Sequence, residues 1–200
     1  MKQALIIIDY IESCCLEEYK DVWFDLGLSK VRSIASSLQE LITFYREQKR
    51  GEVIWITACP WVKGYVHPNV ERLYEENPEA EFYSNTLEGN NFYLIQPEKN
   101  EQVFEKNLYS AFSGTQGKLE VYLKSKDIEH LIISGIYSTG CVNATICEAF
   151  HHGYKLTIIG DCVETFDDED RQAFQRNLFT DWAYMYGKVV NLADFMKSEI

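Results

Sequence analysis

The chain has 200 residues, 46% of them hydrophobic, which fits a single domain, 1–200, with a substantial core. Its 31 acidic side chains outnumber the 19 Lys and Arg, and the formal net charge of −12 repels nucleic-acid phosphates and anionic membrane surfaces. No segment reaches the roughly 20 apolar residues of a membrane span, and the N-terminus has no basic region followed by an apolar signal core. We therefore expect a cytoplasmic protein that binds neither nucleic acid nor membranes.

The cysteines are expected to be reduced thiols, since six of them occur in a chain without a recognisable signal peptide. The sequence has no CxxC and no paired Cys/His spacing of the kind that binds zinc. Cys147 is interpreted as a small buried apolar residue.

Short apolar segments alternate with longer amphipathic ones, a pattern typical of strand and helix units repeated around a parallel sheet. Strands are predicted, in chain order, near 4–8, 52–58, 102–105, 129–135, 155–160 and 188–191. Helices are predicted at 29–50 and near 115–126, 139–152 and 168–184.

The clearest predicted helix is 29–50, with Ser29 as its cap and Gly51 as its stop. Its apolar positions recur on one face, at Val31, Ile34, Ala35, Leu38, Leu41, Ile42 and Tyr45. Acidic residues from Asp167 to Asp170 open the last predicted helix, where they suit the helix dipole. All four prolines lie between 60 and 100, and we interpret that segment as a long irregular connection that forms an ordered covering loop.

Three chemically distinctive residues follow predicted strands. Asp9 comes after 4–8, Lys106 comes after 102–105, and Cys141 lies on the first turn of the helix that follows 129–135. Ligands of open parallel sheets bind outside the carboxyl ends of the strands. We therefore expect the three side chains to converge on one pocket, from strands that lie next to one another.

Together these residue types suit covalent catalysis. The helix N-terminus favours a thiolate at Cys141, Asp9 is a candidate base, and Lys106 is a candidate cation beside the thiolate. The thiolate would attack a carbonyl carbon, with backbone N–H groups around Tyr137 and Cys141 holding the oxyanion. Taken singly, each residue also has a structural reading: a turn-capping Asp, a solvated Lys and a packing Cys.

The segments that carry these residues, Ala4–Asp9, Phe104–Thr115 and Ile133–Val142, resemble the isochorismatase-like cysteine hydrolase family in order and spacing. The resemblance covers almost the whole chain. It implies a three-layer α/β/α sandwich with a mostly parallel, Rossmann-like sheet of about six strands. It also implies catalytic roles for Asp9, Lys106 and Cys141, a cis peptide at Ile136–Tyr137, and a homodimer or homotetramer.

Departures from the family pattern narrow the prediction. Nicotinamidases of the family bind a metal through an Asp and a His in the segment that corresponds to 57–61, and Cys59 and Trp61 stand there in this chain. We therefore predict no metal and no cofactor, and interpret His67 as a solvated loop residue. True isochorismatases generally lack the nucleophilic Cys, which this chain keeps. Tyr137 and Trp61 are the predicted substrate-binding residues.

The sequence thus predicts a metal-independent cysteine hydrolase that cleaves the carbon–nitrogen bond of a small amide or ureide through an acyl-enzyme on Cys141. One alternative is isochorismate-type hydrolysis of a vinyl ether, with Asp9 as the acid and Cys141 as a bystander. The other is a catalytically idle member of the family that serves as a binding partner.

Overall fold

The computed structural model describes residues 1–19, 26–77 and 88–197, and these form a six-stranded sheet in the order β3-β2-β1-β4-β5-β6 with every pair parallel. The strands are β1 (Gln3–Ile8), β2 (Glu52–Ala58), β3 (Gln102–Lys106), β4 (His130–Ile136), β5 (Lys155–Glu164) and β6 (Lys188–Val190). The predicted fold class and all six predicted strands are confirmed, although β5 continues four residues beyond the predicted end.

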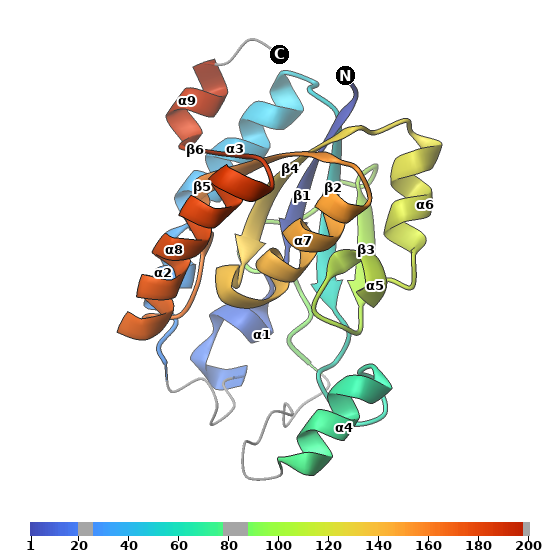
Figure 1. Cartoon of the computed structure of the whole chain (residues 1–200), viewed down its shortest axis with the longest axis vertical. Helices are drawn as coiled ribbons and strands as arrows, with labels where there is room; N and C mark the ends of the chain where they lie inside the picture. The colour runs from blue at the N-terminus through green and yellow to red at the C-terminus, as the bar shows by residue number, and fades with distance from the viewer. Residues whose placement is uncertain (20–25, 78–87, 198–200) are drawn as a thin grey trace.

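Helices cover both faces of the sheet (Figure 1). One face carries α2 (Ser29–Ser33), α3 (Ala35–Glu47) and α9 (Leu192–Lys197). The other carries α5 (Ala111–Gly114), α6 (Lys118–Ser125), α7 (Asn143–His151) and α8 (Glu169–Met185). Two further helices, α1 (Glu12–Cys15) and α4 (Pro68–Glu76), lie at the end of the sheet toward which the strand arrows point.

The central strand β1 shows why the sheet is sandwiched. All six of its residues are buried. Leu5 and Ile7 pack into the core under α2, α3 and α9, whereas Ala4, Ile6 and Ile8 pack into the core under α5 to α8. Successive strand side chains point to opposite faces, so a continuous apolar run requires a covering layer on each side.

The predicted helix 29–50 is two helices, α2 and α3, separated at Ile34. Ser29 is not its cap: it is the first residue of α2, and neither it nor Leu28 provides a side-chain cap. The acceptor comes from far along the chain, because the Asp167 carboxylate accepts hydrogen bonds from Ser29 N at 3.0 Å, Ser29 Oγ at 2.6 Å and Lys30 N at 2.7 Å. The predicted acidic start of the last helix is confirmed, since Asp168 caps α8 by accepting from Arg171 N.

The segment 60–100 is less irregular than predicted, because it contains α4. Pro68 occupies the first turn of that helix, where its missing N–H costs nothing, and His67 Nδ1 caps the helix by accepting from Asn69 N. His67 is therefore a helix cap and not a solvated loop residue. Residues 78–87 of this segment lie outside the described residues.

The described remainder of that segment packs beside the chain after β1. Glu12 N donates to Asn91 O and Ser13 N donates to Gly89 O, each at 2.8 Å.

Within 1–19, 26–77 and 88–197, no helix is both long and apolar enough to cross a lipid bilayer.

Candidate active site

Asp9, Lys106 and Cys141 meet at the carboxyl edge of the sheet. Asp9 directly follows β1, Lys106 ends β3, and Cys141 lies in the helical turn Ser138–Val142 between β4 and α7. Lys106 Nζ lies 2.8 Å from Asp9 Oδ2 and 3.3 Å from Cys141 Sγ. The predicted convergence is confirmed.

The expected neighbour relation of the three strands is only partly correct. β1 pairs with β4, but β2 lies between β1 and β3. The long side chain of Lys106 bridges this separation. From β1 the chain builds β2 and β3 on one side, and it then crosses to β4 on the other side of β1. Asp9 and Cys141 therefore lie on either side of the point where the strand order reverses, which is where open α/β sheets bind ligands.

Gly135 allows β4 to approach β1 just before the Cys141 turn. Its φ is +116°, and a Cβ built there would lie 2.1 Å from the backbone oxygen of Ile8, the residue that precedes Asp9. Only glycine suits that backbone conformation and that contact. The peptide bond Ile136–Tyr137, which follows, is cis, as the motif resemblance implies.

The ion pair of Asp9 and Lys106 is almost fully enclosed, with 3% and 1% of the two side chains exposed. Burial alone would lower the pKa of Lys106, but Asp9 and then Cys141 raise it above the ordinary value. Lys106 is therefore a fixed cation at neutral pH.

The thiol of Cys141 behaves differently from the sequence-based expectation. Burial raises its pKa above the ordinary value; Lys106 acts to lower it, and Asp9 raises it further. The expected thiolate is therefore not favoured in the resting protein, mainly because burial opposes a charge on the sulfur. Cys141 is a neutral thiol that sits between a cation and a carboxylate.

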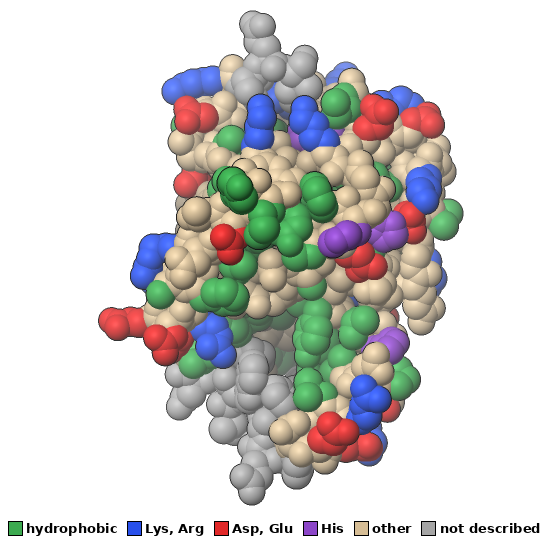
Figure 2. Space-filling model, in the orientation of Figure 1, with side chains coloured by type: hydrophobic (Ala, Val, Ile, Leu, Met, Phe, Trp, Pro, Cys, Tyr) green, Lys and Arg blue, Asp and Glu red, His purple; other side chains and the backbone are tan. Residues whose placement is uncertain are grey.

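These groups open into a pocket of about 700 Å³. Figure 2 shows the hollow on one face of the molecule, below α7 and α8, with hydrophobic side chains around it. Seven aromatic side chains line its wall: Tyr19, Trp61, Tyr74, Tyr109, Tyr137, Phe166 and Phe174.

Both predicted substrate-binding aromatics line this pocket. The Trp61 ring centroid lies 5.9 Å from Lys106 Nζ, and Trp61 Nε1 donates to the Tyr74 hydroxyl. Tyr137 stacks on Phe166 with ring centroids 4.0 Å apart, and its hydroxyl donates to the backbone oxygen of Cys14 at 2.8 Å. The two aromatics are thus held rigidly, and their role in binding stays a prediction.

Sequence reasoning missed many residues of the pocket wall, and two of them, Cys14 and Arg171, bear groups that can carry charge. Cys14 lies on α1, a single turn too short to give a helical period, and burial followed by the charge of Asp9 raises the pKa of its thiol to about 12. Arg171 lies in the first turns of α8, where only the neighbouring acids attracted notice. Cys147, predicted to be buried, is half-buried with Sγ 3.8 Å from Asn143 Oδ1.

The residues present do not form a metal site. Cys59 is a buried thiol whose Sγ contacts Tyr65 O at 3.5 Å, Trp61 has no ligand atom to offer, and His67 Nδ1 is occupied by Asn69 N. Among the described residues, no three His, Cys, Asp or Glu side chains lie close enough together to hold a metal ion.

Comparison with known proteins places this geometry in a family. Maleamate amidohydrolase of Pseudomonas putida is 27% identical over 144 residues, which cover 72% of this chain but only 57% of that protein. N-carbamoylsarcosine amidase of an Arthrobacter species is 39% identical over 85 residues, covering 42% of this chain and 30% of that protein.

The solved structure of a cysteine hydrolase from Pseudomonas syringae pv. phaseolicola has a similar fold, with a TM-score of 0.79 at 21% identity over 98% of this chain and 91% of that one. The family model of the Isochorismatase domain matches residues 3–194. Since that match takes in nearly the entire sequence, the chain belongs to the isochorismatase family.

Proposed function

We propose that this family member is an amidohydrolase that cleaves the carbon–nitrogen bond of a small amide or ureide through an acyl-enzyme on Cys141. The proposal rests on one observation: Lys106 Nζ contacts both Asp9 Oδ2 and Cys141 Sγ, at 2.8 and 3.3 Å, at the base of a pocket. A base, a cation and a thiol in mutual contact are the parts that nucleophilic catalysis by cysteine needs.

The neutral thiol assigns the first proton transfer to Asp9. Asp9 Oδ1 has no hydrogen-bond partner among the described residues, so it is available to accept the thiol proton as the sulfur attacks the carbonyl carbon. Lys106 stays charged and stabilises the negative charge that develops on the sulfur. Asp9 then donates the proton to the departing nitrogen, which leaves as an amine or ammonia.

Water completes the cycle. Asp9 takes a proton from a water molecule that attacks the thioester carbonyl, and collapse of the adduct releases the acid and restores the Cys141 thiol. Backbone N–H groups of the Tyr137–Cys141 turn are the proposed donors to the oxyanion. No step needs a metal, and we expect full activity to persist after chelation.

The pocket wall suggests the shape of the substrate. Trp61 and Tyr109 lie on the β2 and β3 side with ring centroids 6.0 Å apart, while Tyr137 and Phe166 stack beside the Cys141 turn. Aromatic faces favour a flat partner, so we propose a planar amide.

A carboxylate on that amide would find a counter-charge in Arg171. Among the described lining residues the cations are Lys106, which is committed to Asp9, and Arg171, whose Nη1 makes a longer contact of 3.9 Å with Asp168 Oδ1. Glu88 and Asp170 also line the pocket, and their negative charges offset the positive charge of Arg171 at a distance. We therefore expect the substrate carboxylate to be recognised by direct contact with the Arg171 guanidinium. Maleamate and N-carbamoylsarcosine, the compounds named for two relatives, each contain a carboxylate.

The test is a screen of small amides and ureides for ammonia release, followed by intact-mass measurement of the enzyme mixed rapidly with any substrate found. We expect a mass increase equal to the acyl group, located on the peptide that carries Cys141. Turnover by Cys141→Ala at the wild-type rate would instead favour acid catalysis by Asp9, as in vinyl ether hydrolysis. If the protein hydrolyses none of these compounds, and Cys141 reacts with electrophiles at the rate of free cysteine, the chain is the catalytically idle binding member of the family. Assembly into a homodimer or homotetramer stays a prediction, which light scattering of the purified protein would test.

A further inference from the structure

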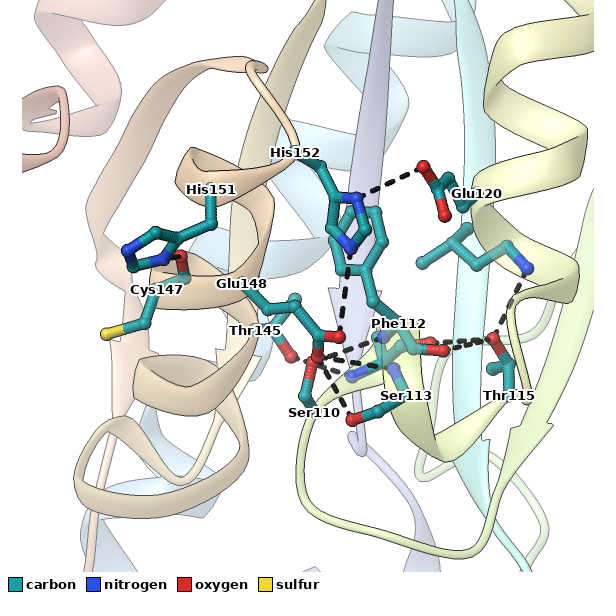
Figure 3. A network of polar contacts seen from close by, with 12 residues as sticks. Ser110, Phe112, Ser113, Thr115, Glu120, Thr145, Cys147, Glu148, His151 and His152 are labelled. Atoms are coloured by element: carbon teal, nitrogen blue, oxygen red, sulfur yellow. Dashed lines mark hydrogen bonds and ion pairs between the residues drawn. The ribbon is translucent and has the colours of Figure 1, made fainter.

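The short helix α5 is capped largely by a neighbouring helix. Its first three amide N–H groups have no partner within the helix, as at every helix start. Ala111 N donates to Thr145 Oγ1 at 3.0 Å, Phe112 N donates to Ser110 Oγ at 3.2 Å, and Ser113 N donates to Glu148 Oε2 at 3.2 Å. Thr145 and Glu148 both belong to α7, three residues apart, so two side chains of α7 accept hydrogen bonds from the first turn of α5 (Figure 3).

On its α5 side, the contact between α5 and α7 lies next to Lys106. Directly after Lys106 the chain turns into α5, and Asn107 N donates back to Gly114 O at 3.0 Å. Gly114 is packed so tightly that an added Cβ would lie 2.9 Å from Lys106 Cβ and 2.8 Å from Leu108 O. The sheet fixes the backbone of Lys106, and α5 packs directly against the start of its side chain.

On its α7 side, the contact lies next to Cys141. Thr145 Oγ1, fully buried, donates to Cys141 O at 2.7 Å while accepting from Ala111 N. A threonine bonded to the carbonyl four residues earlier is common in helices and usually has no wider role. Here the same oxygen also binds a second helix, so one hydroxyl joins the backbone of Cys141 to the helix behind Lys106.

A second layer supports the outer side of the contact. Ser113 Oγ donates to Glu148 Oε2 at 3.0 Å, and the His152 ring lies between Glu120 and Glu148, with its nitrogens 3.1 and 3.7 Å from their carboxylates. The His152 ring stacks on Phe112 of α5 at 5.0 Å (Figure 3). α5, α6 and α7 are thereby tied together on the solvent side of the site.

We infer that Thr145 and Glu148 are positioning residues that hold Lys106 Nζ against Cys141 Sγ by fixing α5 to α7. Lysine has a flexible four-carbon stem, and its ammonium lies 3.3 Å from the sulfur only while the two backbones keep their separation. Small displacements of catalytic groups cost large factors in rate. The consequence for turnover rests on the proposed function, whereas the effect on Cys141 itself does not.

The experiment uses the full chain and measures the rate of Cys141 alkylation by iodoacetamide from pH 6 to 10, read at the Cys141 peptide by mass spectrometry. Thr145→Val keeps the shape of the side chain and removes the hydroxyl. We expect it to slow labelling at least fivefold at each pH of this range, because the thiol is neutral throughout the range and the cation that stabilises the thiolate formed during reaction is loosened. Thr145→Ser restores the hydroxyl and should return the rates to within twofold of wild type.

Two further variants separate positioning from stability. Thr180→Val is the matched control, since exposed Thr180 on α8 makes the same bond four residues back, to Arg176 O at 3.3 Å, away from the pocket. It should leave the labelling profile unchanged. Glu148 lies nearer the surface than Thr145, and Glu148→Ala should slow Cys141 labelling by a smaller factor. This variant keeps the test valid if Thr145→Val does not fold.

A folded Thr145→Val protein with a lower melting temperature but a wild-type labelling profile would overturn the inference. So would a folded Glu148→Ala protein with an unchanged profile, in the case where Thr145→Val does not fold. If no amide is ever hydrolysed, the amidohydrolase proposal fails, and the labelling profiles still decide the role of Thr145 and Glu148.

Discussion

Asp9 and Lys106 form an ion pair that is buried as completely as the apolar core, with Oδ2 and Nζ 2.8 Å apart and at most 3% of either side chain exposed. Removing two charges from water costs several kcal/mol each, and the mutual attraction offsets that cost only while both partners are present. The two residues therefore stabilise the protein as a unit, and the same pairing keeps Lys106 charged beside Cys141.

Lys106→Met tests this unit. The variant keeps the length of the side chain but leaves Asp9 buried without its partner, so we expect the free energy of unfolding to fall by roughly 3–5 kcal/mol, with loss of amide hydrolysis. Urea unfolding followed by circular dichroism measures the first effect. Lys2→Met is the control: the Lys2–Asp127 pair is exposed, and its loss should cost about 1 kcal/mol or less. A Lys106→Met protein as stable as the control would contradict the account.

Cys141→Ala should abolish amide hydrolysis, by on the order of a thousandfold or more, while the fold stays intact, because the change removes the reacting sulfur and little buried area. Cys141→Ser should be nearly as inactive, since a hydroxyl has a much higher pKa than a thiol and a carboxylate base activates it poorly. Steady-state ammonia release measures both. Cys147→Ala, on the next turn, is the matched control and should keep its activity.

The motif residues were predictable because each lies at or shortly after the carboxyl end of a strand, and parallel strands bring these ends to one edge. Sequence order does not contain the strand order, however, and the placement of β2 between β1 and β3 was therefore missed. The reach of Lys106 across that strand is visible only in three dimensions.

Other features depend on contacts between distant segments. Asp167 caps the helix that begins at Ser29, and Thr145 joins the local cap Ser110 at the helix that begins at Ala111, so both helix starts are bound by a residue from far along the chain. The pKa of Cys141 was misjudged for a similar reason. The helix-end effect is local and readable from the sequence, but burial and the pairing of Lys106 with Asp9 arise only on folding.

Arg171→Ala tests the proposed recognition of a carboxylate. For isosteric pairs such as maleamate with maleamide, we expect kcat/KM of the anionic amide to fall roughly tenfold or more, the value of about one lost charge-assisted hydrogen bond. The neutral diamide should change less than about threefold, since it has no charge for the guanidinium to meet. Arg176→Ala, exposed on the same helix and absent from the pocket wall, is the control. Equal losses for both members of a pair would exclude a role for Arg171 in carboxylate recognition.

Gly135→Ala should be severely destabilising, by roughly 3 kcal/mol or more, because its Cβ would lie 2.1 Å from Ile8 O and the residue has a φ of +116°. Thermal unfolding and the yield of folded protein measure the effect. Gly160→Ala is the comparison within the neighbouring strand β5, since the atom nearest to its added Cβ is 3.5 Å away, an ordinary contact. We expect that change to cost about 1 kcal/mol or less. Similar stabilities of the two variants would show that β4 can move away from β1.

His130 makes the stability of the fold depend on pH. The residue begins β4, and its Nε2 lies 2.9 Å from Thr157 Oγ1. Burial first, and then the positive charges of Lys155, Lys188 and the N-terminus, lower its pKa from 6.5 to about 4. The unfolded chain therefore binds a proton between about pH 6.5 and 4 that the folded protein does not bind, so stability falls as pH decreases through that window.

The change is measured by urea unfolding at intervals from pH 7 to pH 4, for wild type and for His130→Gln. Carboxylates also titrate toward the acid end, and the variant subtracts their contribution because it differs only at the imidazole. A full proton would give a slope of about 1.4 kcal/mol per pH unit, and we expect a fraction of that, since His130 is only partly buried and solvent screens the neighbouring charges. Wild type should therefore lose stability faster than His130→Gln as the pH falls, and parallel curves would mean that His130 binds its proton equally well in the folded and unfolded states.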